Sequence, residues 1–302
     1  MPNYKAVATF NTPSKNLVRE LAIAGATGST GLFLPSSEAL CVRYAAKHTK
    51  LKSLVCCEQE PKRAKALFAN VMASRTLQGT IPIIHPGSVQ GMDPHAVRFH
   101  YMFLDLCGSV SQPLAAWLAA QKAHRTEIAI TLTRCWRSSA YMQAVSTVLK
   151  GQDAFMDQCV SLACPAVRLG ADSSLTPMEF SDCNRKQLAM LHLIFAGAGL
   201  SFSRVVNYGG ASGSGIPMTM FRFFVEPKRL GLRRSVTLAA ELVKKLTRRK
   251  KLRPELVQHA CEHYANKKWT PLRQCWRSAT AGQRAAISKR CGESLYARFA
   301  RP

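Results

Sequence analysis

Short apolar runs alternate with longer amphipathic stretches through the first half of the chain. A short apolar run bounded by turn residues is typical of a buried β-strand, whereas apolar residues that recur every three or four positions are typical of a helix. The pattern predicts five strands, at Gly31–Pro35, Leu51–Cys57, Ile81–His85, Tyr101–Leu106 and Glu127–Thr133.

Helices are predicted between these strands, at Glu38–His48, Pro61–Ser74 and Gln112–Ala123, and a further short helix precedes them at Asn16–Ala24. Pro61 stands in the first turn of its helix, where the missing N–H costs nothing. Strands that alternate with helices form parallel sheets, because each crossover helix returns the chain to the end of the sheet at which the previous strand began. The first half of the chain therefore predicts a Rossmann-like α/β domain.

The second half changes character. After Ala140 the pattern is helical, with an interruption at Pro165–Pro177 and a further helix at Asp182–Ala198. Two strand-like runs follow, Ser203–Tyr208 and Met218–Val225, joined by a Gly/Ser-rich segment that predicts a hairpin with a wide loop. We therefore expect a parallel sheet that ends in an antiparallel hairpin, followed by a helical, basic stretch from Arg233 onward.

Charge separates the two parts further. The chain carries 42 Lys+Arg against 17 Asp+Glu, a net of +25. Residues 227–302 hold 20 of these basic residues and only 4 of the acids, a net of +16 in a quarter of the chain. Such asymmetry indicates a part that binds polyanions. We predict an α/β domain at 1–226 and a basic helical domain at 227–302.

The basic domain predicts a nucleic-acid partner, either RNA or DNA, because lysine and arginine neutralise backbone phosphates. The sequence does not distinguish the two polymers. The candidate contacts are the clustered basic residues Lys244, Lys245, Arg248, Arg249, Lys250, Lys251, Arg253, Lys267 and Lys268.

Cysteine usage and hydropathy bear on the compartment. The 11 cysteines include no Cys-x-x-Cys pair, and no apolar leader precedes them. Reduced thiols in a cytoplasmic protein are expected. No apolar run approaches the roughly 20 residues of a membrane span, so no membrane partner is expected.

The strand ending at Cys57 is followed at once by Glu58. An acid at the tip of the second strand of a nucleotide-binding fold lies beside the ligand crevice, where its carboxylate accepts hydrogen bonds from ribose hydroxyls. Counting from the preceding strand end, Pro35, to Glu58 gives 23 residues, close to the roughly 20 expected between that turn and the acid.

The run from Glu58 through Glu60-Pro61 to Asn70 resembles the second motif of class I S-adenosylmethionine-dependent methyltransferases. The helix with Arg43-Tyr44-Ala45 and the strand end Asp105-Leu106-Cys107-Gly108-Ser109 are locally similar to the tRNA guanine-N2 dimethyltransferase family. The resemblance spans about a hundred residues. It implies transfer of a methyl group to a base nitrogen of a nucleic acid.

The resemblance also implies roles for individual residues. Asp105 would orient the target amine as the catalytic residue, and Arg43 would contact nucleic acid. No metal is implied. S-adenosylmethionine would be bound by Pro35, Ser36, Ser37, Glu58, Gln59 and Ser88.

Two departures keep a second hypothesis open. The glycines expected in the first motif are replaced by Pro35-Ser36-Ser37-Glu38, and no proline or aromatic residue follows Asp105. Glycine at such a loop lets the backbone approach the cofactor closely. A catalytically inactive methyltransferase fold that binds nucleic acid as a structural or assembly factor is therefore the alternative.

A third hypothesis comes from the loop Gly25–Gly31, which resembles the glycine fingerprint of NAD(P)-dependent short-chain dehydrogenases. That fingerprint must follow a strand and open a helix. Here an apolar, strand-like run follows it, and Tyr141 has Val145 rather than lysine four residues on. The two interpretations differ in whether residues 25–31 lie before or after the first strand.

Overall fold

The computed structural model describes residues 13–35, 37–77, 79–106, 109–133, 140–170, 172–209, 217–251, 253–266, 269–279, 283–284, 287–288 and 291. The chain forms two compact units, Met1–Ala240 and Glu241–Pro302. The division falls inside helix α8 (Arg233–Lys251), later than the 226/227 boundary drawn from charge.

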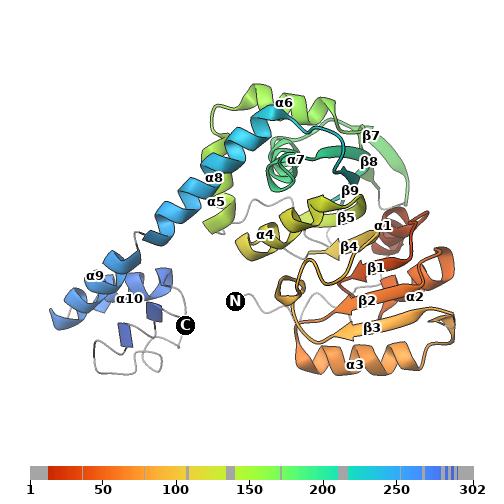
Figure 1. Ribbon diagram of the computed structural model, residues 1–302, viewed down its shortest axis with the longest axis horizontal. Helices are drawn as coiled ribbons and strands as arrows, with labels where there is room; N and C mark the ends of the chain where they lie inside the picture. The colour runs from red at the N-terminus through yellow and green to blue at the C-terminus, as the bar shows by residue number, and fades with distance from the viewer. Residues whose placement is uncertain are drawn as a thin grey trace. The chain divides into compact units, whose positions relative to one another are not determined.

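The first unit is built on a parallel sheet (Figure 1). All five strands predicted in the first half are confirmed, with ends that differ by no more than two residues. They pair in parallel in the order β3-β2-β1-β4-β5. Their bounds are β1 Thr30–Phe33, β2 Ser53–Cys57, β3 Ile81–His85, β4 Tyr101–Asp105 and β5 Thr126–Thr133.

The predicted hairpin completes this sheet. Strands β8 (Gly199–Tyr208) and β9 (Met218–Glu226) pair antiparallel, and β9 inserts antiparallel between β5 and β8. A parallel sheet extended by an antiparallel hairpin is the expected Rossmann-like methyltransferase arrangement, which is thus confirmed, although two further strands follow β8. The full order is β3-β2-β1-β4-β5-β9-β8-β6-β7.

The last two strands of this order were missed by the sequence analysis. Strands β6 (Ala166–Leu169) and β7 (Leu175–Met178) form a short hairpin at the far edge, with β6 parallel to β8. Each has only four residues, and Pro177 lies inside β7. Proline is tolerated there because β7 is an edge strand and needs no N–H for an outer neighbour.

Two layers of helices cover the sheet. Helices α1 (Pro13–Ile23), α2 (Leu40–His48) and α3 (Pro61–Met72) share one buried cluster with alternate strand residues such as Phe103 and Met220. On the opposite face, Phe195 after α7 packs edge-on to Phe223 of β9, with ring centroids 5.8 Å apart. The helices that contact α7 (Asp182–Ile194) are α4 (Gln112–Ala120), α5 (Ala140–Leu149) and α6 (Asp153–Ser161).

Helix α1 is attached to the sheet through its C-terminal carbonyl groups. Buried Arg222 of β9 donates from Nη1 to the carbonyls of Leu21 (3.1 Å) and Ala24 (2.6 Å), and from Nε to Glu127 of β5 at 2.7 Å. Tyr101 of β4 donates its hydroxyl to the Ala22 carbonyl at 2.8 Å. These bonds satisfy carbonyl groups that a helix end leaves without intrahelical partners.

The second unit has a small core of its own. Helices α9 (Arg253–Ala265) and α10 (Trp269–Ser278) contact each other around buried Ala260, Leu272 and Trp276. Trp276 is 4% exposed, so it stabilises this core instead of offering a stacking face to a base. In the described part of the chain, no helix has both the length and the apolar content needed to cross a membrane.

Candidate methyltransferase site

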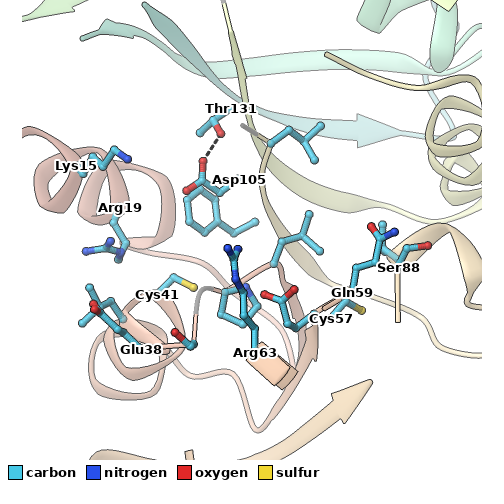
Figure 2. A pocket seen from close by; sticks show the side chains of 18 of the residues that line it. Lys15, Arg19, Glu38, Cys41, Cys57, Gln59, Arg63, Ser88, Asp105 and Thr131 are labelled. Atoms are coloured by element: carbon cyan, nitrogen blue, oxygen red, sulfur yellow. Dashed lines mark hydrogen bonds between the residues drawn. The ribbon is translucent and has the colours of Figure 1, made fainter. Parts of the chain in front are cut away.

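A cavity of about 570 Å³ opens at the carboxyl ends of the parallel strands (Figure 2). Ligands of open α/β sheets bind at this end, where loops leave neighbouring strands in different directions. The size falls within the usual range for small-molecule sites. The described residues that the sequence analysis selected for cofactor binding or catalysis all line this cavity: Pro35, Ser37, Glu58, Gln59, Ser88 and Asp105.

Glu58 is held in place by its own turn. Its N–H donates to the carbonyl of His85 at the end of β3 (3.2 Å), which continues the sheet past β2. Its Oε1 accepts from the Glu60 N–H at 2.9 Å, just before Pro61 begins α3. These two bonds fix the carboxylate at the cavity wall. Among the described residues, no hydrogen bond engages Oε2.

The loop between β1 and α2 lines the cavity, although it contains no glycine. Ala39 adopts the left-handed conformation, with φ 55° and ψ 26°, at the N-cap of α2. Because Ala39 is fully buried and does not line the cavity, its methyl group takes no space from a ligand. Asn70 at the end of α3 donates from Nδ2 to the Ser37 carbonyl at 2.8 Å and so fixes this loop. Ser36 lies outside the described residues.

This loop also corrects the predicted start of the following helix. The sequence placed it at Glu38, but α2 begins at Leu40. The left-handed backbone of Ala39 cannot belong to a right-handed helix, which sets the start of α2. Glu38 instead lines the cavity.

Asp105 ends β4, directly beside Thr131 of β5 in the parallel register. The buried Thr131 hydroxyl donates to Asp105 Oδ1 at 2.5 Å, as the dashed line in Figure 2 marks. This bond fixes the carboxylate at the mouth of the cavity, where Asp105 itself is exposed. Cys107 and Gly108, which follow it in the motif, lie outside the described residues.

The loop after β3 forms another wall of the cavity. Ser88 precedes the short 3-10 helix η3 (Val89–Gly91), and both Val89 and Gln90 line the cavity. Gln90 Oε1 accepts from the Ser111 hydroxyl at the start of α4 (3.2 Å), which connects this loop to the next crossover.

Several lining residues were missed by the sequence analysis. Arg63 reaches the cavity from the first turn of α3, and Figure 2 shows its side chain extending inward between the walls. The first turn of a helix after a strand-end acid faces the crevice, so its position was a usable signal. Lys15 and Arg19 arrive from α1, and Tyr208 and Met218 from the inner ends of the hairpin. No local motif marks those four residues.

Two cysteines with unreactive thiols, Cys41 and Cys57, also line the cavity. Burial raises the pKa of both Cys41 and Cys57 to about 12. Since the thiolate is the reactive form, both thiols stay neutral and unreactive near pH 7. The charged lining is mixed instead: three cations, Lys15, Arg19 and Arg63, face three carboxylates, Glu38, Glu58 and Asp105.

A buried polar cluster supports the hairpin behind Tyr208 and Met218. Asn184 of α7 donates from Nδ2 to Thr219 Oγ1 at 2.8 Å, and Asn207 donates from Nδ2 to Asn184 Oδ1 at 3.0 Å. All three side chains are fully buried. A satisfied buried network specifies one arrangement of its backbone. Asn207 directly precedes Tyr208, and Thr219 directly follows Met218. The cluster therefore positions these two cavity residues of the hairpin.

The residues predicted to contact nucleic acid are distributed differently. Arg43 is half-buried on α2, and its Nη2 donates to the Asn70 carbonyl at 3.5 Å, outside the cavity lining. Lys244 is exposed on α8, and Lys245 beside it is half-buried. The side chains of Arg248, Arg249, Lys250, Lys251 and Arg253 lie outside what the structure describes, as do Lys267 and Lys268 entirely.

The glycine loop at residues 25–31 does not have the place that the dehydrogenase interpretation needs. Helix α1 ends at Ile23, and β1 begins at Thr30, so the loop precedes the first strand. Gly28 has φ 105°, and a Cβ there would collide with His100. Gly28 is therefore needed because its backbone lies close to the His100 side chain. Since the loop lies before the first strand and does not open a helix, the dehydrogenase interpretation is wrong. Across the described ranges, no three His, Cys, Asp or Glu side chains gather into a possible metal site.

No protein-family model and no curated protein matches the chain. Among solved structures, it is similar to the N-methyltransferase NodS from Bradyrhizobium japonicum WM9, with 10% identity, 70% of this chain and 93% of that chain covered, and a TM-score of 0.41. A second similar structure is the small RNA methyltransferase HEN1, with 13% identity, 73% of this chain and 26% of that chain covered, and a TM-score of 0.41. It is also similar to M. jannaschii TYW2 in complex with AdoMet, with 11% identity, 70% of this chain and 76% of that chain covered, and a TM-score of 0.36. The fold assignment rests on the strand order and register described above.

Proposed function

We propose that the chain binds S-adenosylmethionine in the cavity and transfers its methyl group to a base nitrogen of RNA or DNA. The observation that carries this proposal is the convergence of Pro35, Ser37, Glu58, Ser88 and Asp105 on one cavity at the carboxyl ends of four different strands. These residues are far apart in the sequence and follow separate strands. Separate loops that converge in this way are typical of a binding site at a switch point of the sheet.

The residues present fit the nucleoside part of the donor. With Oε1 held by the Glu60 N–H, Glu58 presents Oε2 to accept a ribose hydroxyl. Ser88 and Val89 would border the adenine, and Pro35 and Ser37 the methionine part. The left-handed Ala39 supplies the turn that glycine supplies elsewhere, with its methyl group buried away from the cavity.

The donor, when bound, supplies a methyl group already activated on a sulfonium, so the protein contributes mainly position. The Thr131 hydroxyl holds Asp105 Oδ1, which leaves Oδ2 to accept a hydrogen bond from an exocyclic amine. That bond would orient the amine nitrogen toward the donor. The net charge of +25 supports a nucleic-acid substrate, because a strongly positive field concentrates polyanions.

A methyl-transfer assay tests this function. The donor carries tritium in its methyl group, and total RNA and denatured DNA are the acceptors. We expect label in one polymer, and a rate about 100-fold lower for Asp105→Asn. The single oxygen of the Asn amide would accept from the Thr131 hydroxyl, and the NH2 in place of Oδ2 cannot accept the amine hydrogen bond. The donor Kd should not change. The control is Asp93→Asn, since Asp93 caps its own turn through the His95 N–H outside the cavity.

No label in either polymer, or an Asp105→Asn rate equal to that of the wild type, would contradict the proposal. The alternative is a nucleic-acid-binding protein that keeps this fold without catalysis. Its support is the absence of glycine from Pro35 to Glu38. That alternative predicts nucleic-acid binding with no measurable affinity for the donor, so donor binding separates the two functions.

A further inference from the structure

A second pocket, of about 500 Å³, lies at the opposite end of the same sheet. Its walls are the segments that lead into β4 and β5 and the segment that leaves β9. Because β9 runs antiparallel to β5, its carboxyl end meets the amino ends of β4 and β5. The pocket is therefore formed entirely within the first unit and shares no residue with the cavity that contains Glu58 and Asp105.

Cations dominate the pocket. Arg98, Arg125 and Lys228 are exposed in its wall together with His124, and Glu226 is the one acid that lines it. Glu226 Oε1 lies 3.5 Å from Arg125 Nε, so it offsets only part of this charge. The three exposed cations repel one another, and an anionic ligand in the pocket would relieve that repulsion.

The guanidinium of Arg125 is already oriented. Its Cζ lies 5.0 Å from the centroid of the Phe224 ring, a cation–π contact that limits the rotation of the side chain. Two further cations flank the pocket in fixed positions. Lys122 donates to the Ala196 carbonyl at 3.2 Å, and Arg229 donates to Ser201 Oγ at 3.4 Å.

We infer that this second pocket binds phosphate groups of a nucleic-acid backbone. Planar guanidinium groups bind phosphate oxygens through paired N–H donors, and a lysine adds a mobile charge. The inference rests on the proposed action on nucleic acid and extends it, because nothing in the methyl-transfer site requires a phosphate contact at the far end of the sheet.

The position of the pocket limits the substrate. Arg125 precedes β5, and Thr131, six residues further on, lines the first cavity. At roughly 3.3 Å per residue the two sites lie about 20 Å apart along that strand. A mononucleotide is too short to reach both. At about 3.4 Å per base pair, a duplex must contribute at least about six pairs to do so. The expected substrate is therefore an extended or folded polynucleotide.

The test compares two triple variants of the full chain. Arg98→Gln/Arg125→Gln/Lys228→Gln neutralises the pocket. Lys47→Gln/Lys65→Gln/Lys150→Gln removes the same charge from exposed lysines elsewhere on the first unit. Fluorescence polarisation of labelled 20-nucleotide RNA and DNA is measured from 50 to 300 mM NaCl, and donor binding is measured by calorimetry.

We expect the pocket variant to bind at least about tenfold more weakly than the control variant at 100 mM salt. Its slope of log affinity against log salt should be shallower by about 2, since each lost phosphate contact removes about 0.7 for a single strand. Donor binding should be equal in both. Equal slopes and affinities of the two variants, with wild-type binding intact, would overturn the inference and leave the proposed function standing.

Two other results would also overturn it. If the wild type binds neither polymer, the nucleic-acid part of the proposed function fails with it, whatever the donor does. The second probe is a vesicle with 30% phosphatidylserine. Should the pocket variant lose vesicle binding while it keeps wild-type RNA and DNA binding, the pocket recognises an anionic lipid surface instead.

Discussion

His192 on α7 shows how burial makes a single side chain sensitive to pH. The imidazole is 3% exposed, lies 5.9 Å from the Phe202 ring and has no hydrogen-bond partner at Nε2 within the described structure. Burial lowers its pKa to about 4, because the charged form would lose its hydration without gaining a partner. The folded state therefore keeps His192 neutral at pH values where the unfolded chain protonates it.

This difference predicts a loss of stability in mild acid. The unfolded histidine, with a pKa near 6.5, binds more protons than the folded one between about pH 6.5 and 4. The contribution of His192 is therefore fully present above pH 6.5 and falls as the pH drops toward 4. At pH 5 the loss is about 2 kcal/mol of unfolding free energy. Urea unfolding at pH 7 and pH 5 measures it.

Substitution separates His192 from other titrating groups. His192→Leu should reduce the difference between pH 7 and pH 5 by about this amount, whereas His95→Leu, at an exposed position, should leave it unchanged. An equal pH dependence in the wild type and His192→Leu would show that His192 does not carry the effect.

Helix α1 precedes the alternating strands and helices of the sheet. It nevertheless supplies two cavity-lining residues, Lys15 and Arg19. It is anchored through the buried Arg222–Glu127 pair, in which Arg222 also binds two α1 carbonyls. A buried pair contributes little compared with apolar replacements, but removal of one partner leaves an uncompensated charge.

Arg222→Met should therefore lower the unfolding free energy by about 3–5 kcal/mol. The matched control is Arg125→Met, whose partner Glu226 forms a more exposed ion pair, and which should cost less than about 1 kcal/mol. Urea denaturation followed by circular dichroism measures both. Glu127→Gln added to Arg222→Met should recover part of the loss. Similar losses for Arg222→Met and Arg125→Met would contradict the anchoring role of the buried pair.

At this scale the sequence predicts some elements and misses others for physical reasons. Strands β1, β2, β4 and β5 were predictable because they are short, mainly apolar runs buried on both faces. The edge strand β3 leaves Ile81 and Ile83 exposed and was found from its apolar run alone. Strands β6 and β7 were missed because each has only four residues, too few to show periodicity, and β7 contains a proline. Glu58 and Asp105 were found because strand ends have fixed places in this fold. Lys15 and Tyr208 were not, since distant segments bring them to the cavity.

In the molecule as a whole, two pockets of different charge lie at opposite ends of the strands of one sheet. The carboxyl ends of the strands hold a mixed-charge cavity suited to a small ligand, and the amino ends hold a cationic pocket suited to phosphate. A further net charge of +16 lies in residues 227–302. Affinity for nucleic acid should therefore be distributed over both units and fall steeply with salt.

Binding of S-adenosylmethionine in the cavity through Glu58 can be measured by calorimetric titration of the donor. The wild type should bind, and Glu58→Gln should bind about 10- to 100-fold more weakly, because a hydrogen bond to a charged group contributes about 1.5–3 kcal/mol. Glu179→Gln is the control, since Glu179 is exposed and does not line the cavity. It should bind like the wild type. No binding to the wild type at millimolar donor, or equal affinities of Glu58→Gln and Glu179→Gln, would contradict this binding mode.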